Sequence, residues 1–130
     1  MRWLALALVL SPAALGANTW GGDTYPRQTG VDVVHYVFRL VLGDASDEIT
    51  GEATITVKFL IDTLGDVQLD LASTSAGKGM TVASVRRGGV TETPGPASDA
   101  LVFSHANNRL RLVLPAASKA GQEFTFTVRY

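Results

Sequence analysis

Residues 29–60 contain two runs rich in β-branched and aromatic residues, VDVVHYVFRLVL and ITGEATITVKF, and the polar segment GDASDE separates them. The two-residue period predicts two strands. On the first strand, the face that we expect to be buried carries Val34, Tyr36, Phe38, Leu40 and Leu42. The second strand is expected to bury Ile49, Ala53, Ile55, Val57 and Phe59. Because GDASDE is rich in residues that favour turns, we predict one long hairpin.

Shorter runs with the same period follow this hairpin. They are VQLDLA (67–72), MTVASVRRGGV (80–90), LVFSH (101–105), RLRLVLP (109–115) and EFTFTVRY (123–130). Asn107-Asn108 predicts a tight turn between two of them, since asparagine tolerates the left-handed backbone that such turns need. No run has the 3.6-residue period of a helix. Seven or eight short strands therefore predict an all-β fold, an antiparallel β-sandwich or saddle.

The first 17 residues have the pattern of a cleavable signal peptide. Arg2 precedes the apolar run WLALALVL, and small residues follow Pro12. The apolar run is shorter than the roughly 20 residues that cross a membrane, so it predicts no membrane span. We expect export to the periplasm or the medium, with cleavage after Gly16 or Ala17.

Composition and charge limit the number of domains and the kinds of protein that this sequence can encode. After the signal peptide, residues 18–30 predict an extended lead-in, and residues 31–130 suffice for one domain. The 11 basic and 12 acidic residues give a net charge of −1. This balance does not indicate the basic surface that nucleic-acid binding requires. The chain has no cysteine, which excludes disulfides and thiolate metal ligands.

Candidate catalytic and metal-binding residues are few. His35 and His105 are the only histidines, and neither has a partner at metal-ligand spacing, so we expect structural roles for both. Asp44, Asp47 and Glu48 lack the spacing of an EF-hand loop and predict a solvated hairpin tip. We therefore assign no catalytic, cofactor-binding or metal-binding residue in this chain.

Two further short motifs occur in the sequence. Ser75 and Lys78 have the Ser-x-x-Lys spacing of serine β-lactamases, but that motif requires a helical turn, and Gly77 lies between them in a predicted loop. Arg86 and Arg87 next to two glycines could hold a carboxylate or form a solvated rim.

The sequence VDVVHYVFRLVL followed by DEITGEATITVKFL resembles the opening hairpin of the amino-terminal domain of M1 family zinc aminopeptidases. The resemblance extends from about Tyr25 to Tyr130. It implies a non-catalytic domain that scaffolds a downstream peptidase domain, and this second domain would hold the zinc ion and cleave amino-terminal residues from peptide substrates. The family's Gly-x-Met-Glu-Asn and His-Glu-x-x-His motifs do not occur in this sequence.

The resemblance also implies that the domain is incomplete at its C-terminal end, because the family's domain continues through further strands. We therefore expect exposed strand edges, with EFTFTVRY the segment most prone to pair with a second copy. We also expect Phe38 to be buried against other strands and Arg39 to face water. The alternative is a free-standing exported β-sandwich that binds a protein or carbohydrate partner.

Overall fold

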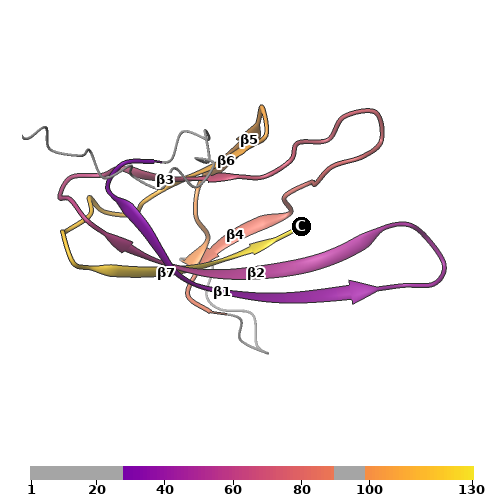
Figure 1. Cartoon of the computed structure of the whole chain (residues 1–130), viewed down its shortest axis with the longest axis horizontal. Coiled ribbons are helices and arrows are strands. Elements are labelled where there is room, and N and C mark those ends of the chain that lie inside the picture. Colours follow the sequence, from indigo (N-terminus) through magenta and orange to yellow (C-terminus); the bar gives the residue numbers. More distant parts are fainter. Residues whose placement is uncertain (1–27, 90–98) are drawn as a thin grey trace, which may run out of the picture.

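The computed structural model describes residues 28–89 and 99–130 as two antiparallel β-sheets that share one core (Figure 1). The strands are β1 (Val31–Leu42), β2 (Ile49–Phe59), β3 (Asp66–Asp70), β4 (Ser84–Arg87), β5 (Phe103–Ala106), β6 (Arg109–Val113) and β7 (Glu123–Arg129). One sheet has the order β1-β2-β7-β4 and the other β3-β6-β5. The predicted all-β antiparallel fold is therefore confirmed. The predicted signal peptide and the lead-in up to residue 27 lie outside the described residues.

The long hairpin of β1 and β2 forms as predicted, and the faces of β2 are also as predicted. Ala53, Ile55, Val57 and Phe59 are buried, whereas Ile49, at the hairpin end of the same face, was expected to be buried and is exposed. The threonines between them lie on the opposite face, where Thr54 and Thr56 are half-buried. The strict two-residue period of a strand explains this agreement, because it fixes which side chains share a face.

Strand β1 departs from the predicted pattern at Val34. Val33 pairs with Val57, and His35 pairs with Thr56, so Val34 is an extra residue in the ladder. Since directly paired residues lie on the same face, Val33 faces inward with Val57, whereas the predicted pattern places its neighbour Val34 on the inner face and so Val33 on the outer one. The physical reason is a β-bulge, which adds one residue and shifts the period of the strand.

The predicted burial of one face of β1 is wrong, since all five residues expected there are exposed: Val34, Tyr36, Phe38, Leu40 and Leu42. Phe38 pairs with the buried Ala53 and so lies on the predicted face, yet 59% of it is exposed. The far half of the hairpin extends past the three-stranded sheet (Figure 1), so no second layer of the described residues covers it. Alternation predicts the face of a side chain, whereas burial also requires an element opposite that face.

Strand β7 is a central strand. It pairs with β2 on one side and with β4 on the other, so the expectation that EFTFTVRY forms a bare edge is wrong. Phe124, Phe126 and Val128 are buried on its inner face, as predicted. The position of a strand in the sequence does not determine its position in the sheet, because antiparallel connections can cross over.

The second predicted hairpin is confirmed. Strands β5 and β6 flank Asn107 and Asn108, which have φ angles of 54° and 60°. Strand β4 is shorter than the predicted run of residues 80–90, and Val90 lies outside the described residues. Residues 71–83 instead form an excursion that connects β3 to β4 (Figure 1).

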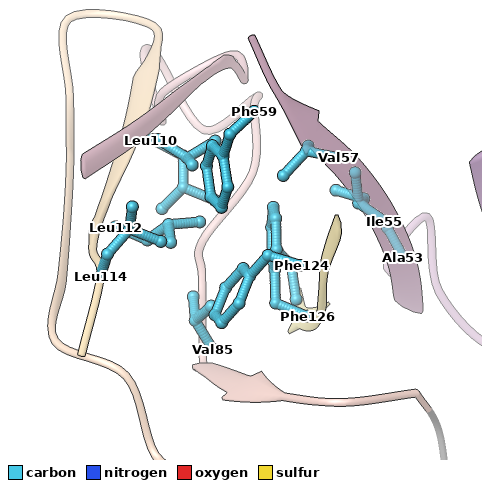
Figure 2. Packing of buried hydrophobic residues seen from close by; sticks show 12 residues of the cluster. Ala53, Ile55, Val57, Phe59, Val85, Leu110, Leu112, Leu114, Phe124 and Phe126 are labelled. Atoms are coloured by element: carbon cyan, nitrogen blue, oxygen red, sulfur yellow. The ribbon is translucent and has the colours of Figure 1, made fainter. Parts of the chain in front are cut away.

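The core lies between the two sheets and contains twelve buried apolar residues, most of which Figure 2 labels. Phe126 from β7 and Leu112 from β6 are fully buried. The rings of Phe59, Phe124 and Phe126 pack at tilted angles, with centroids 6.3 Å and 6.0 Å apart. Such tilted contacts add to the free energy gained from apolar burial.

We expect Phe126→Ala to lower the free energy of unfolding by about 3–5 kcal/mol, because it removes a fully buried ring and leaves a cavity. Phe38→Ala serves as the matched control and should cost less than about 1 kcal/mol, since that ring is mostly exposed. Urea unfolding of the three proteins measures both effects. Equal midpoints for the two variants would contradict this description of the core.

Candidate functional site

The open side of the sandwich, between the edge strands β1 and β3, carries a groove with two adjoining halves. The polar half has a volume of about 580 Å³ and the apolar half about 270 Å³. Tyr36, Leu69 and Asp70 line both halves, so the two are continuous. Concave sites that combine apolar walls with a few polar groups are typical of binding surfaces.

The apolar half lies against the long hairpin. Tyr36 and Phe38 form one wall, and their rings are stacked with centroids 5.6 Å apart and planes 8° apart. Met80 from the 71–83 excursion and Tyr130 also line this half of the groove. The exposed apolar face continues along the hairpin through Leu40, Leu42 and Ile49, which are 56%, 72% and 53% exposed.

Gly51 allows the side chains of Leu40 and Tyr130 to pack closely against strand β2. A Cβ atom at this position would lie 2.9 Å from both Leu40 Cδ2 and Tyr130 Cε2, which is closer than real Cβ contacts. The backbone of Gly51 also exchanges two hydrogen bonds with Tyr130, of 2.7 Å and 3.0 Å. Only glycine therefore lets these two side chains approach the strand without displacement.

The polar half is organised by Gln28, which precedes β1. Its Oε1 accepts a hydrogen bond of 2.8 Å from the backbone N–H of Gln68, and its Nε2 donates one of 3.0 Å to the Asp66 carbonyl. The amide side chain thus pairs with the backbone of β3 as a neighbouring strand would. This contact satisfies part of the free edge of β3.

Asp66 is the one described group whose pKa is clearly perturbed. Burial raises its pKa, but hydrogen bonds from Arg111, Gln68 and Gln28, together with the charge of Arg111, lower it below its usual value of 3.8. Arg111 Nε donates to Asp66 Oδ2 over 2.7 Å. A second ion pair on this surface joins Arg109 and Asp70 at 3.3 Å. These contacts hold β3 to β6.

The two histidines lie apart, on different sheets. His35 is exposed beside the bulge of β1. His105 Nε2 lies 2.9 Å from the Leu71 carbonyl and 3.4 Å from Ser73 Oγ. Because a carbonyl oxygen only accepts hydrogen bonds, Nε2 carries a proton and donates a hydrogen bond to the Leu71 carbonyl. His105 therefore fastens the 71–83 excursion to β5.

The other candidate residues are also dispersed. Asp44, Asp47 and Glu48 are exposed at the hairpin tip. Ser75 and Lys78 flank a tight turn and exchange backbone hydrogen bonds of 2.7 Å and 3.0 Å, so they are not arranged on a helical turn. Among residues 28–89 and 99–130, no group of three His, Cys, Asp or Glu side chains is placed to hold a metal ion.

Arg87 packs over the ring of Phe124, with 5.7 Å between its Cζ atom and the ring centroid. This contact is a cation–π interaction, which gives Arg87 a structural partner. The described part of the chain contains no helix that is long and apolar enough to cross a membrane.

Comparison with known proteins identifies the fold. No protein-family model matches the sequence, and no curated protein matches it significantly. The structure matches a mutant two-domain M1 zinc metallopeptidase bound to L-tryptophan, with a TM-score of 0.61, 22% identity, and coverage of 80% of this chain and 21% of that chain. The same kind of mutant bound to L-arginine matches with a TM-score of 0.60, 21% identity and the same coverage.

The described residues therefore have a β fold that also occurs in structures of M1 zinc metallopeptidases. The fold that the sequence resemblance implied is confirmed. The chain spans about a fifth of the length of these solved structures.

The ion pair of Asp66 gives a testable pH dependence. Its folded pKa lies below the unfolded value of 3.8, so its stabilising contribution is present above that pH and is lost as the pH falls through the folded pKa. We expect Asp66→Asn to lower the free energy of unfolding at about pH 6 by up to about 1 kcal/mol, and by less at about pH 3. Urea unfolding at both pH values measures the difference, and a pH-independent difference would contradict this assignment.

Proposed function

We propose that this chain is the non-catalytic amino-terminal domain of an exported M1-like zinc aminopeptidase, and that it scaffolds a second domain that removes amino-terminal residues from peptides. The observation that carries the proposal is the apolar face of the long hairpin, which remains largely exposed among the described residues. The fold likeness to two-domain zinc metallopeptidases supports the choice of partner.

The exposed face has the properties of a domain interface. Tyr36, Phe38, Leu40 and Leu42 lie in one row, each between 46% and 72% exposed. Contiguous exposed apolar surfaces of this kind mark interaction sites in folded proteins. Burying one such ring or aliphatic side chain contributes roughly 1–2 kcal/mol, so docking this row would hold two domains together.

Zinc belongs to the second domain in this proposal. No described residue of this chain is placed to hold the metal, and the two histidines are on different sheets. When bound in a peptidase domain, zinc polarises the peptide carbonyl and lowers the pKa of its water ligand. We assign no step of that chemistry to residues of this chain, whose role is to position its partner domain.

A free-standing binding module is the second candidate. The stacked rings of Tyr36 and Phe38 lie beside a polar groove that contains Asp70 and Arg109. Aromatic faces next to polar groups can bind either a protein segment or a carbohydrate. This candidate predicts a ligand for the isolated chain, whereas the first predicts a covalently linked partner.

We expect the isolated chain to bind no stoichiometric zinc and to release no amino acid from aminoacyl chromogenic substrates, since two separated histidines do not supply three ligands. The complete protein should release them in a chelator-sensitive reaction. Equilibrium dialysis and a chromogenic assay measure the two properties. A complete protein without chelator-sensitive aminopeptidase activity would refute the proposed function.

We expect Phe38→Asp in the complete protein to weaken the docking of the two domains and to lower its thermal midpoint by several degrees, because a carboxylate would then face an apolar interface. Val102→Asp is the matched control, since Val102 is 72% exposed and lies outside the hairpin. Differential scanning calorimetry compares the variants. Equal midpoints for Phe38→Asp and Val102→Asp would show that the hairpin face is not the interface.

Export is the remaining part of the proposal. The charged, apolar and small-residue segments of residues 1–17 support a signal peptide. We expect the mature chain to begin at Ala17 or Asn18 outside the cytoplasm. Intact-mass analysis tests this expectation, and a soluble cytoplasmic chain that retains Met1 would contradict it.

A further inference from the structure

Gln28 joins the two sheets across the open side of the sandwich. Besides the two hydrogen bonds to the backbone of β3, its Nε2 lies 3.3 Å from Asp66 Oδ1. In Figure 1 the indigo start of the chain lies at the level of β3, and β1 runs from there to the other sheet. Among the described residues, the hydrogen bonds that connect β3 to β1 or to the residues before β1 all involve Gln28.

The backbone next to Gln28 is fixed to the first sheet. Thr29 and Gly30 form a turn, and the Gly30 carbonyl accepts a hydrogen bond of 2.8 Å from the N–H of Leu60, directly after β2. Gly30 has a φ angle of 89°, and a Cβ atom there would lie 2.6 Å from Ile61 Cγ1, so this position requires glycine. Gln28 is therefore held by the first sheet through its backbone and by the second sheet through its side chain.

The chemistry of the side chain suits this bridge. An amide carries both an acceptor oxygen and a donor nitrogen, and the β3 edge presents the Gln68 N–H and the Asp66 carbonyl at matching positions. Methionine has a similar length and flexibility but neither group. Replacement of Gln28 by methionine therefore removes the hydrogen bonds and leaves an unbranched side chain of about the same size.

The bridge lies outside the buried core. Gln28, Asp66 and Gln68 are half-buried, whereas Val67, between them on β3, is fully buried. Water can therefore replace the hydrogen bonds of Gln28 while the core side chains stay covered. Segments with accessible hydrogen bonds and few buried apolar contacts open at a lower free energy than the whole domain.

We propose that Gln28 is a latch between the two sheets, which closes the polar half of the groove and opens while the core stays folded. In the closed state, Val31, Val33 and Leu69 are half-buried in the wall of the groove. Opening the latch releases the Gln68 N–H and the Asp66 carbonyl to water and uncovers these apolar side chains. The latch thereby controls access to the groove.

The latch is separate from the docking face under Proposed function. That face runs along β1 from Tyr36 to Leu42, whereas Gln28 precedes the strand. The latch therefore opens and closes in the chain by itself, without a second domain. The failure of one proposal does not decide the other.

The Gln68 amide reports on the latch directly, because its acceptor is Gln28 Oε1. We expect Gln28→Met to speed hydrogen exchange at Gln68 by about tenfold or more, measured by NMR. The Leu71 amide, which donates to the Asn108 carbonyl over 2.9 Å, should keep its rate. Gln122→Met is the matched control variant, since Gln122 is exposed and lies outside the groove.

The unsubstituted chain provides a second readout. Exchange through local opening is insensitive to low concentrations of urea, whereas exchange through global unfolding accelerates with urea. We expect the Gln68 rate to be independent of low urea, and the rates of amides in the central strand β7 to rise with it.

The chain contains no cysteine, so a single cysteine measures access to the groove. Val33→Cys places a thiol on the groove wall, and Val85→Cys places one in the core, where Val85 is 1% exposed. We expect Gln28→Met to raise the rate of thiol labelling several-fold at Val33→Cys. The rate at Val85→Cys, which requires global unfolding, should stay the same.

Faster exchange at Gln68 and faster labelling of Val33→Cys, with unchanged rates at Leu71 and Val85→Cys, support the latch. An unchanged Gln68 rate in Gln28→Met overturns it, because the amide would then not depend on Gln28. Faster exchange without faster labelling also overturns it, since the groove would then stay closed. Equal acceleration at the two amides or the two cysteines, or a Gln68 rate that follows urea as β7 does, would show global unfolding instead of a latch.

Discussion

The pairing of β2 with β7 joins the first half of the chain to its last strand, and both faces of this pair contribute. On the inner face, Ile55 lies opposite Phe126 and Val57 opposite Phe124, which builds the centre of the core. On the outer face, the hydroxyls of Thr54 and Thr127 lie 3.0 Å apart. Cross-strand pairs are the unit of sheet stability, so this one ladder supports both the core and the outer surface.

The elements that the sequence predicts well are those with local causes. The alternation in residues 49–59 gives the faces of β2, and the two asparagines at 107–108 give the turn between β5 and β6. The elements that it misses depend on distant partners. The central position of β7 and the exposure of Phe38 both follow from sheet order and from the limited extent of the second layer. Neither has a signal in the local pattern.

The groove was harder to predict because it joins residues that are distant in the sequence. Tyr36 from β1, Asp70 from β3 and Arg109 from β6 meet at the open side of the sandwich. The hydrogen bonds of Gln28 to β3 have no sequence signature, since a glutamine in a lead-in is ordinary. The bulge at Val34 has no distinct signal either, because successive apolar residues also occur at Tyr36–Phe38 and Leu40–Leu42, where the ladder is regular.

The bulge at Val34 also determines where a homologous hairpin can lose one residue without a change in its strand pairing. The ladder continues from Val33–Val57 directly to His35–Thr56, so Val34 contributes to neither pair. A homologous chain lacking this one residue would retain every partner of β1 and every side chain on its present face. Elsewhere in the strand, the loss of one residue would exchange the two faces of all that follows. Position 34 is therefore the place in β1 where the loss of one residue would change neither the strand pairing nor the faces of the strand.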